Sequence, residues 1–395
     1  MIVQNLRRIF INNYYKSSEK LTIMFKNPFS SNKPEENVSD RITEFLSEYQ
    51  SELFPGGVIN SVSAFNIAQN KQTYILEFTL PFPCQGELED IARELVTHLD
   101  IDIELALTLN IKPVRTHNIS GIKNIIAIAS GKGGVGKSTT SVNLAYALMA
   151  EGAKVGILDA DIYGPSIPTM LGIENQRPSS VDGKLMQPLL ANGLTAMSIG
   201  FLVSDTDATV WRGPMASSAF SQMLNETAWQ GDGAPLDYLI IDMPPGTGDI
   251  QLTLAQKVPV AAATIVTTPQ DIALKDAVKG INMFDKVKVP VLGVIENMSY
   301  HLCENCGHHS HLFGQGGAEH IASQYKVDLL GQLPLNIHIR EDSDAGKSSV
   351  LANTTSEITM LYRKIARNMA AQLYNQLDAN SPYTAEIITV KNIEE

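Results

Sequence analysis

The chain has 395 residues, of which 44% are hydrophobic and 18% are charged. This composition is ordinary for a globular protein, and the length predicts two domains. The formal net charge of −12 argues against a general nucleic-acid or anionic-membrane surface, because both need basic patches. No apolar run approaches the ~20 residues that span a bilayer, and three cysteines in so long a chain indicate thiols in a reducing compartment. The sequence therefore predicts a cytoplasmic protein without nucleic-acid or membrane partners.

The first 37 residues are predicted to be an extension followed by a linker. Residues 1–26 are basic and aromatic, but they lack both the Ser/Arg richness of an organellar presequence and the apolar core of a secretory signal. We interpret them as disordered or misannotated, with Met24 as an alternative start of translation. Residues 27–37 are rich in Ser, Asn and Pro, which is typical of a linker.

Residues 38–113 predict a small α+β domain. Apolar residues have helical spacing over 39–52 and 87–99, and they alternate as in strands over 58–68, 73–80 and 103–111. Cys84 comes just before the second helix. Because a helix N-terminus can lower the pKa of a thiol, Cys84 is either a functional thiol or a structural residue.

Residues 114–124 are predicted to link this domain to a second one over 125–377, and residues 378–395 to form a flexible tail. Apolar, β-branched runs predict strands at 125–130, 154–159, 195–200, 238–242, 262–268, 290–297 and 329–333. Helices are predicted at 140–149, 216–228, 249–257, 271–286, 317–325 and 356–377. This alternation indicates an α/β fold with a doubly wound, mostly parallel sheet, in which ligands bind at the carboxyl ends of the strands.

The segment GKGGVGKST, residues 131–139, lies between the first strand and helix of this second domain and matches a P-loop. Its glycines let backbone N–H groups wrap a phosphate chain, and the helix N-terminus adds partial positive charge. Lys137 is expected to reach the β- and γ-phosphates, and the Ser138 hydroxyl to bind Mg²⁺. Lys132 is a second lysine, which the P-loop pattern does not require. Either it neutralises transition-state charge, in its own site or a partner's, or it is a solvated loop lysine. The expected nucleotide contacts are Gly131, Lys132, Gly133, Gly134, Val135, Gly136, Lys137, Ser138 and Thr139.

Two further strand ends carry carboxylates. Asp159 and Asp161 follow the second predicted strand in DADIYGPS; one carboxylate suits Mg²⁺ and the other is suited to orient the attacking water. Asp242 ends an apolar strand in DYLIIDMPPGTGD, which is the pattern of a Walker-B carboxylate that faces the metal. The PPGTG that follows is suited to a switch that moves on hydrolysis.

A C-x-x-C pair, Cys303 and Cys306, is followed by His308, His309 and His311. The pair places two soft ligands within reach of one metal. Three interpretations stay open. A redox pair is disfavoured because no helix is predicted to start at the motif. A zinc site would use two Cys and two His of one chain, whereas an iron–sulfur cluster, which usually takes four thiolates, would need two copies of the chain.

With these motifs in place, the chain resembles the Mrp/ApbC family of iron–sulfur cluster carrier ATPases, which are P-loop proteins related to the MinD/ParA group. The resemblance covers about residues 120–350. It includes GKGGVGKST, DADIYGPSIP, WRGPM (211–215), DYLIIDMPPGTGD, ENMS (296–299) with CENCG, and FGQGG (313–317). Residues 40–113 resemble the MIP18-type domain often fused ahead of such ATPases, although FPGG (54–57) stands where that family often has an acidic Asp-Pro-Glu turn.

The resemblance implies an ATP-driven homodimer that carries a cluster between scaffold proteins and apo iron–sulfur proteins. Lys132 would reach across the dimer interface, and Asp161 would position the hydrolytic water. Asp242 would lie near the Mg²⁺ site and Asn297 near the adenine.

Under the same resemblance, Cys303 and Cys306 would bridge a labile [4Fe–4S] cluster with their dimer mates. The expected cofactors are therefore ATP, Mg²⁺ and the [4Fe–4S] cluster. Two alternative functions remain: a positioning ATPase of the MinD/ParA kind, and a zinc-dependent nucleotide switch that inserts another metal.

Overall fold

The computed structural model describes residues 14–16, 20–26, 37–71, 73–162, 164–180, 183–202, 213–230, 233–303, 305–376, 386–387 and 391–392. The chain divides into two compact units, one formed by Met1–Lys112 with Asp378–Glu395 and the other by Pro113–Leu377. Within the described ranges, no helix combines the length and the apolar character needed to cross a bilayer.

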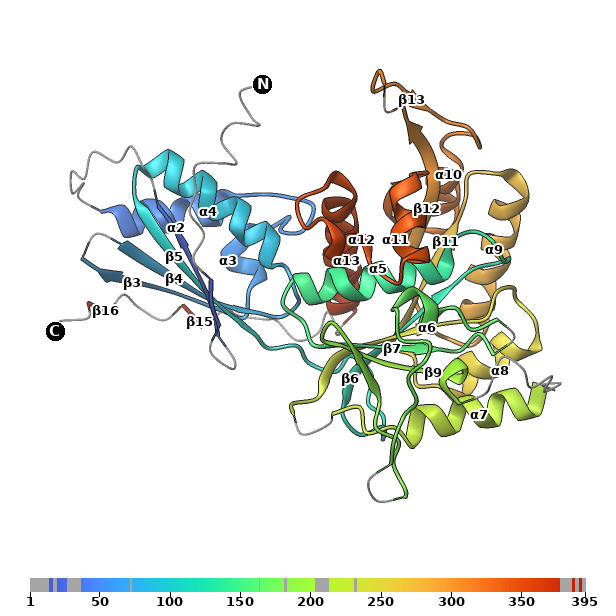
Figure 1. The fold of residues 1–395 in the computed structure, drawn as a ribbon. Helices are drawn as coiled ribbons and strands as arrows, with labels where there is room; N and C mark the ends of the chain where they lie inside the picture. The colour runs from blue at the N-terminus through green and yellow to red at the C-terminus, as the bar shows by residue number, and fades with distance from the viewer. Residues whose placement is uncertain are drawn as a thin grey trace. The chain divides into compact units, whose positions relative to one another are not determined.

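The first unit is a sheet covered by helices (Figure 1). Its strand order is β1–β2–β5–β4–β3–β15, and β16 also pairs with β3. Buried and partly exposed residues alternate over most of β4 and over the first half of β5, because one face packs against the helices. The strands are β1 (Tyr14–Lys16), β2 (Leu21–Phe25), β3 (Ala64–Asn70), β4 (Thr73–Leu80), β5 (Asp102–Leu109), β15 (Glu386–Ile387) and β16 (Lys391–Asn392). The helices are α2 (Val38–Glu48), α3 (Val58–Ser61) and α4 (Gln85–Leu99).

Two predictions for this unit are wrong in part. Leu21–Phe25, predicted within the N-terminal extension, form β2, which pairs antiparallel with β5 and buries Ile23 and Phe25 completely. The predicted strand at 58–68 begins instead with the short helix α3, which follows Gly57 in a left-handed conformation (φ 90°). Residues 27–36 and most of 378–395 lie outside the described ranges, and the likeness to a MIP18-type domain stays a prediction.

The second unit contains the larger sheet, of order β13–β12–β11–β6–β10–β7–β9–β8, with β14 also beside β12. All pairs are parallel except β8 with β9 and β12 with β13. The strands are β6 (Ile122–Ala129), β7 (Val155–Asp159), β8 (Leu189–Ala191), β9 (Leu194–Ser198), β10 (Leu236–Asp242), β11 (Ala262–Thr267), β12 (Val291–Leu302), β13 (His309–Ser310) and β14 (Asp328–Pro334). The helices are α5 (Lys137–Ala150), α6 (Ile167–Met170), α7 (Gly213–Asn225), α8 (Asp249–Lys257), α9 (Asp271–Lys286), α10 (Gly317–Tyr325), α11 (Ile337–Asp344), α12 (Ser349–Ala352) and α13 (Glu357–Asn375).

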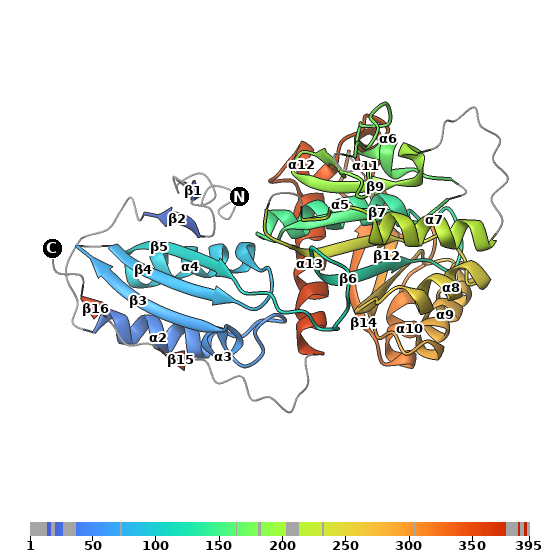
Figure 2. The same ribbon diagram turned by 90° about the horizontal axis from the view of Figure 1, so that it is seen from below.

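Helices cover both faces of this sheet (Figures 1 and 2). The pair α5 and α13 packs on one face, and α7, α8 and α9 lie on the other. The central strand β10 is buried along its whole length, as expected for a parallel strand covered on both sides. Glu151 at the end of α5 is fully buried and pairs with Arg363 and Arg367 of α13 at 2.7 and 2.9 Å, which ties the two helices together.

The predicted α/β fold with a doubly wound, mostly parallel sheet is confirmed for this unit. The helices predicted at 249–257, 271–286 and 317–325 coincide with α8, α9 and α10. One strand runs further than predicted: β12 continues past residue 297 to Leu302 and so reaches the C-x-x-C pair. The predicted linker ends early, because β6 begins at Ile122.

Candidate functional site

The P-loop connects β6 to α5, and the geometry requires three of its glycines, Gly131, Gly134 and Gly136. Gly134 and Gly136 have φ of 80° and 81°, a region that favours glycine. Gly131 passes so close to α9 that an added Cβ would lie 2.1 Å from the backbone of Asp276. A side chain at any of these positions would therefore strain or displace the loop.

The loop borders a cavity of about 190 Å³. Three predicted catalytic residues line it together: Lys132, Lys137 and Asp161. The full lining consists of Ser130, Lys132, Gly133, Gly134, Gly136, Lys137, Ser138, Thr139, Asp161, Ser166, Met170 and Pro245. Val135 is buried beneath the loop and does not line the cavity.

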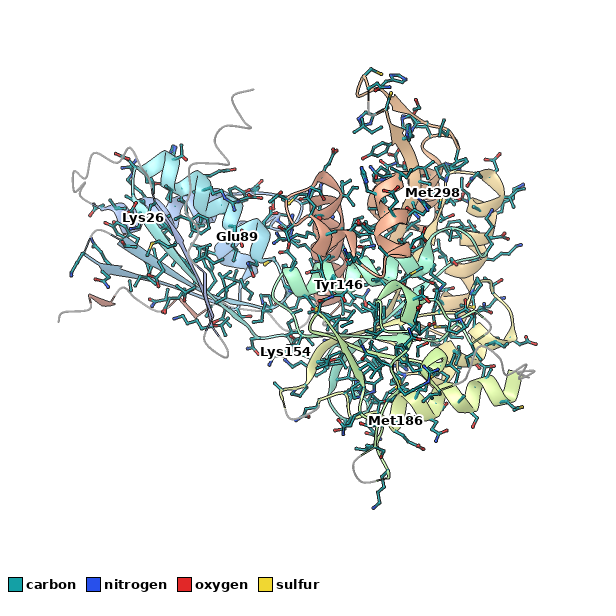
Figure 3. The ribbon with its side chains drawn as sticks, viewed as in Figure 1. Lys26, Glu89, Tyr146, Lys154, Met186 and Met298 are labelled. Atoms are coloured by element: carbon teal, nitrogen blue, oxygen red, sulfur yellow. The ribbon has the colours of Figure 1, made fainter. Side chains whose placement is uncertain are left out.

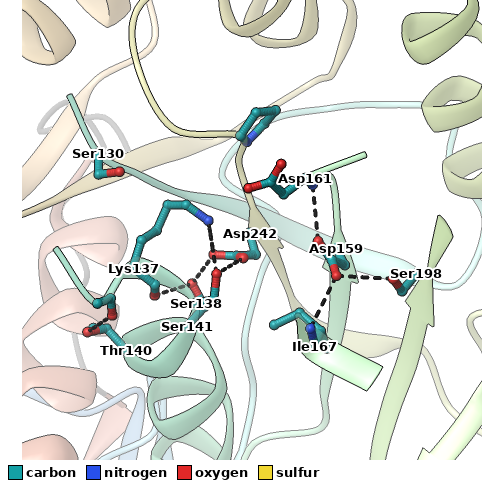
Figure 4. Close-up of polar contacts among 12 residues, drawn as sticks. Ser130, Lys137, Ser138, Thr140, Ser141, Asp159, Asp161, Ile167, Ser198 and Asp242 are labelled. Atoms are coloured by element: carbon teal, nitrogen blue, oxygen red, sulfur yellow. Dashed lines mark hydrogen bonds and ion pairs between the residues drawn. The ribbon is translucent and has the colours of Figure 1, made fainter. Parts of the chain in front are cut away.

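Lys137, which lines this cavity, forms a buried ion pair with Asp242 (Figure 4). The Lys137 Nζ lies 2.7 Å from Asp242 Oδ1, and the two side chains are 6% and 0% exposed. The hydroxyl of Ser138 donates to Asp242 Oδ2 at 2.6 Å, and that of Ser141 to Oδ1 at 2.7 Å. A lysine, a hydroxyl and a carboxylate predicted from two separate motifs thus meet at one point, where α5 starts and β10 ends.

Asp159, at the end of β7, holds the segment that carries Asp161. Its Oδ1 accepts the backbone N–H of Asp161 at 3.0 Å, and its Oδ2 accepts from Ile167 N at 3.3 Å and Ser198 Oγ at 3.0 Å (Figure 4). Burial, and secondarily the charge of Asp242, raises the pKa of Asp159 from 3.8 to about 7. Of the two carboxylates in this segment, Asp161 therefore faces the cavity, whereas Asp159 is a buried support.

The side chain of Asn297 also contacts the P-loop, at the backbone of the loop. The side-chain amide donates to the carbonyl of Val135 at 2.9 Å, and a Cβ on Gly136 would lie 2.2 Å from the same nitrogen. Asn297 is 8% exposed and does not line the cavity. Its position near the adenine stays a prediction, while its contact with the loop was not anticipated from the sequence.

The PPGTG segment after β10 is joined to the P-loop strand and to α8. Gly246 donates its N–H to the carbonyl of Ser130 at 2.9 Å. Gln251 of α8 accepts from the N–H of Gly248 at 2.8 Å and donates to the carbonyl of Pro244 at 3.2 Å. Sequence reasoning did not single out Gln251, because a glutamine in an amphipathic helix carries no distinguishing signal.

The C-x-x-C pair lies in the turn of the β12–β13 hairpin, which Figure 1 shows extending beyond the body of the sheet. Cys306 is exposed and Cys303 partly exposed. The turn closes through the N–H of Gly307, which donates to the carbonyl of Cys303 at 2.8 Å. Because a hairpin turn rather than a helix holds the motif, the structure departs from the thioredoxin arrangement.

Two of the neighbouring histidines, His309 and His311, contact residues of β12. The His309 ring stacks on Tyr300 with centroids 4.8 Å apart, and His311 Nδ1 lies 3.2 Å from the carbonyl of Ser299. Within the described ranges, which omit residue 304, no three Cys, His, Asp or Glu side chains are arranged to hold a metal ion. The described residues of one chain therefore do not assemble the predicted two-Cys, two-His zinc site.

This fold and site define a class of protein. A glycine loop between a buried strand and a helix, with a lysine and a serine at one cavity and a strand-end aspartate bonded to both, is the arrangement of a P-loop NTPase. Its sheet is doubly wound, and the cavity lies at the carboxyl ends of β6, β7 and β10.

Comparison with known proteins narrows this class. Residues 121–370 match the ParA family profile described as the NUBPL iron-transfer P-loop NTPase. The chain is 54% identical over 340 residues to the iron–sulfur cluster carrier protein of Escherichia coli K12, covering 84% of this chain and 91% of that one. It is 49% identical over 257 residues to the iron–sulfur cluster transfer protein NUBPL of Mus musculus, covering 65% and 79%. The chain therefore belongs to the family of NUBPL-type iron-transfer P-loop NTPases.

A solved structure agrees with this assignment. The nucleotide-binding protein from Archaeoglobus fulgidus, in complex with ADP, is 39% identical to this chain with a TM-score of 0.51. The match covers 58% of this chain and 88% of that one. The resemblance inferred from the motifs is confirmed. Trp211 and Arg212 of the WRGPM motif lie outside the described residues.

Proposed function

We propose that this protein is an ATP-hydrolysing iron–sulfur cluster carrier, which holds a labile [4Fe–4S] cluster between two copies of the chain and transfers it to apo-proteins. One observation carries the proposal: a single unit contains both a P-loop cavity and, on the hairpin of β12, a pair of thiols of which Cys306 is exposed and Cys303 partly exposed. The names of its relatives support cluster transfer as the purpose of this combination.

Nucleotide binding begins with an exchange of partners at Lys137. Without nucleotide, the Lys137 ammonium neutralises Asp242; the phosphates of ATP offer it stronger anionic partners. The hydroxyl of Ser138 and the carboxylate of Asp242, 2.6 Å apart, are hard oxygen donors of the type that Mg²⁺ prefers. When bound there, Mg²⁺ supplies charge neutralisation to the β- and γ-phosphates.

Hydrolysis is then the attack of water on the γ-phosphorus of ATP, which breaks the bond to ADP and releases phosphate. Asp161 is the carboxylate at the cavity suited to orient that water, and Asp159 fixes its backbone. Lys132 lies at the same cavity. We assign it the role of neutralising the negative charge that develops in the transition state, in its own site or in that of a second copy.

The cluster is the cargo, and its ligands are Cys303 and Cys306. Two thiolates per chain are half of the four that a [4Fe–4S] cluster usually takes. A two-fold axis through the hairpins would bring four thiolates together. Because Cys306 is exposed at the hairpin turn, a second copy can reach it. The nucleotide state would then set how closely the two copies approach.

Anaerobic reconstitution tests the cluster site. The wild type is expected to retain about four iron and four sulfide per dimer, and Cys306→Ala close to none. Cys84→Ala is the matched control, because Cys84 is buried in the other unit and its loss should leave retention unchanged. Equal retention by the wild type and Cys306→Ala would remove the cluster assignment, and a zinc content near one per chain would replace it with the zinc alternative.

The nucleotide site is tested separately. Lys137→Ala should abolish ATP hydrolysis, because it removes the ammonium that contacts the phosphates, while cluster loading is spared. Lys154→Ala, on an exposed residue before β7, is the control and should hydrolyse ATP at the wild-type rate. Unchanged turnover in Lys137→Ala would remove the ATPase assignment. Sedimentation with ATP and cluster present tests the dimer, and a persistent monomer would exclude the shared site.

A further inference from the structure

Strand β12 changes its pairing between the sheet and the cysteine hairpin. Glu296 pairs with Gln332 of β14, but the next paired residue is Tyr300, opposite Pro334, so the register shifts over residues 297–299. Met298 has φ of 55°, a left-handed conformation that is uncommon outside glycine. Figure 3 places Met298 on β12 between the sheet and the hairpin. We refer to residues 297–299 as the β12 bulge.

The carboxylate of Glu296 holds this bulge from inside the protein. Glu296 is completely buried and accepts three hydrogen bonds. The donors are Ser299 Oγ at 2.5 Å, the N–H of Ala318 in α10 at 3.1 Å, and Gln332 Nε2 in β14 at 2.9 Å. The bulge, a helix and the neighbouring strand are therefore fixed by one side chain.

One end of the bulge contacts the P-loop, and the other end contacts the segment that carries the cysteine hairpin. At its start, Asn297 donates to the carbonyl of Val135 in the P-loop, and Met298 Cε lies within 3.8 Å of the position of a Cβ on Gly136. At its end, the carbonyl of Ser299 lies 3.2 Å from Nδ1 of His311, the residue that follows β13 of the hairpin. Three consecutive residues thus connect the loop that would surround the phosphates to the hairpin that carries the thiols.

We propose that Glu296 is a positioning residue that, by holding the β12 bulge in one register, transmits nucleotide binding at the P-loop to the cysteine hairpin. The proposal rests on the proposed function only in requiring that nucleotide binds the P-loop. A bulge is a point where the ladder is already interrupted, so the segment beyond it can change orientation with little loss of backbone bonding. Glu296 decides whether a displacement of Asn297 moves the hairpin or is absorbed within the bulge.

The rate at which Cys306 is alkylated measures the position of the hairpin. We would treat metal-free protein with iodoacetamide, with and without Mg·ADP, and quantify the peptide that contains Cys306 by mass spectrometry. In the wild type, Mg·ADP is expected to change the rate about fivefold, the lower end of typical coupling between two sites. Sedimentation of each sample at the same concentration reports any dimer that would also shield the thiol.

Ser299→Ala and Glu296→Gln test the role of the bulge. Both should bind Mg·ADP with unchanged affinity by calorimetry, yet show less than about a twofold effect of nucleotide on the alkylation rate. Ser323→Ala, an exposed serine of α10, is the matched control and should keep the fivefold effect. If Glu296→Gln does not fold, Ser299→Ala decides, because it removes one hydroxyl and leaves the carboxylate in place.

Two results would overturn the proposal. One is a wild-type alkylation rate that Mg·ADP does not change. The other is a full nucleotide effect in Ser299→Ala at an equal degree of dimerisation. Neither result would contradict the proposed function, which fails only if ATP is not hydrolysed or the cluster is not retained.

Discussion

Replacing Lys137 by methionine should destabilise the protein as well as inactivate it. Methionine keeps most of the apolar stem and removes the ammonium, so Asp242 is left as a buried, fully desolvated charge. Breaking a buried ion pair by removing one partner costs about 3–5 kcal/mol. Because the hydroxyls of Ser138 and Ser141 continue to donate to Asp242, we expect the lower end, about 3 kcal/mol in the free energy of unfolding.

The double variant Lys137→Met/Asp242→Asn separates stability from function. Asparagine removes the uncompensated charge, so about 2 kcal/mol of the loss should return, whereas ATP hydrolysis should stay absent. Urea unfolding followed by tryptophan fluorescence is the assay. Both tryptophans, at positions 211 and 229, belong to the second unit, so the signal reports the unit that contains the pair.

Two outcomes would refute this reasoning. If Lys137→Met were as stable as the wild type, the pair could not be the buried contact described above. If the double variant were less stable than Lys137→Met alone, the destabilisation would come from lost packing and not from the unpaired charge. Lys154→Met, which changes an exposed lysine, controls for the substitution itself and should unfold at the wild-type urea concentration.

Three further predictions concern other parts of the second unit. Because the pKa of Asp159 is raised from 3.8 to about 7, the folded state holds its proton over a range where the unfolded state has lost it. The free energy of unfolding should therefore fall by about 1.4 kcal/mol per pH unit between about pH 4 and pH 7. Urea unfolding at a series of pH values measures this slope, which should be absent in Asp159→Asn. Glu151→Ala should cost about 3–5 kcal/mol by removing the buried carboxylate that pairs with Arg367; a loss under about 1 kcal/mol would contradict this. Gly136→Ala should lower the affinity for Mg·ADP, measured by calorimetry, far more than Gly134→Ala. Both glycines have a left-handed φ, but only a Cβ at Gly136 would meet Asn297. Equal losses of affinity would show that backbone strain alone matters.

Much of the second unit follows from local signals. The P-loop pattern fixed the positions of Lys137 and Ser138, and the alternation of apolar strands with amphipathic helices predicted the doubly wound sheet. These features depend on neighbours in the sequence, so periodicity and glycine spacing reveal them. The first unit was predicted less well, because β2 (Leu21–Phe25) is a short strand whose burial depends on β5, some 80 residues away.

The sequence by itself therefore determined the class of protein, the phosphate-binding loop and the pair of thiols. Only the tertiary structure decided which side chains meet: Lys137 with Asp242 of β10, and Asn297 of β12 with a P-loop carbonyl 162 residues earlier. It also separated Asp161, at the cavity, from the buried Asp159. The physical reason is that these contacts depend on the order of strands in the sheet, which places β10 and β11 on either side of β6, and no local pattern of residues encodes that order.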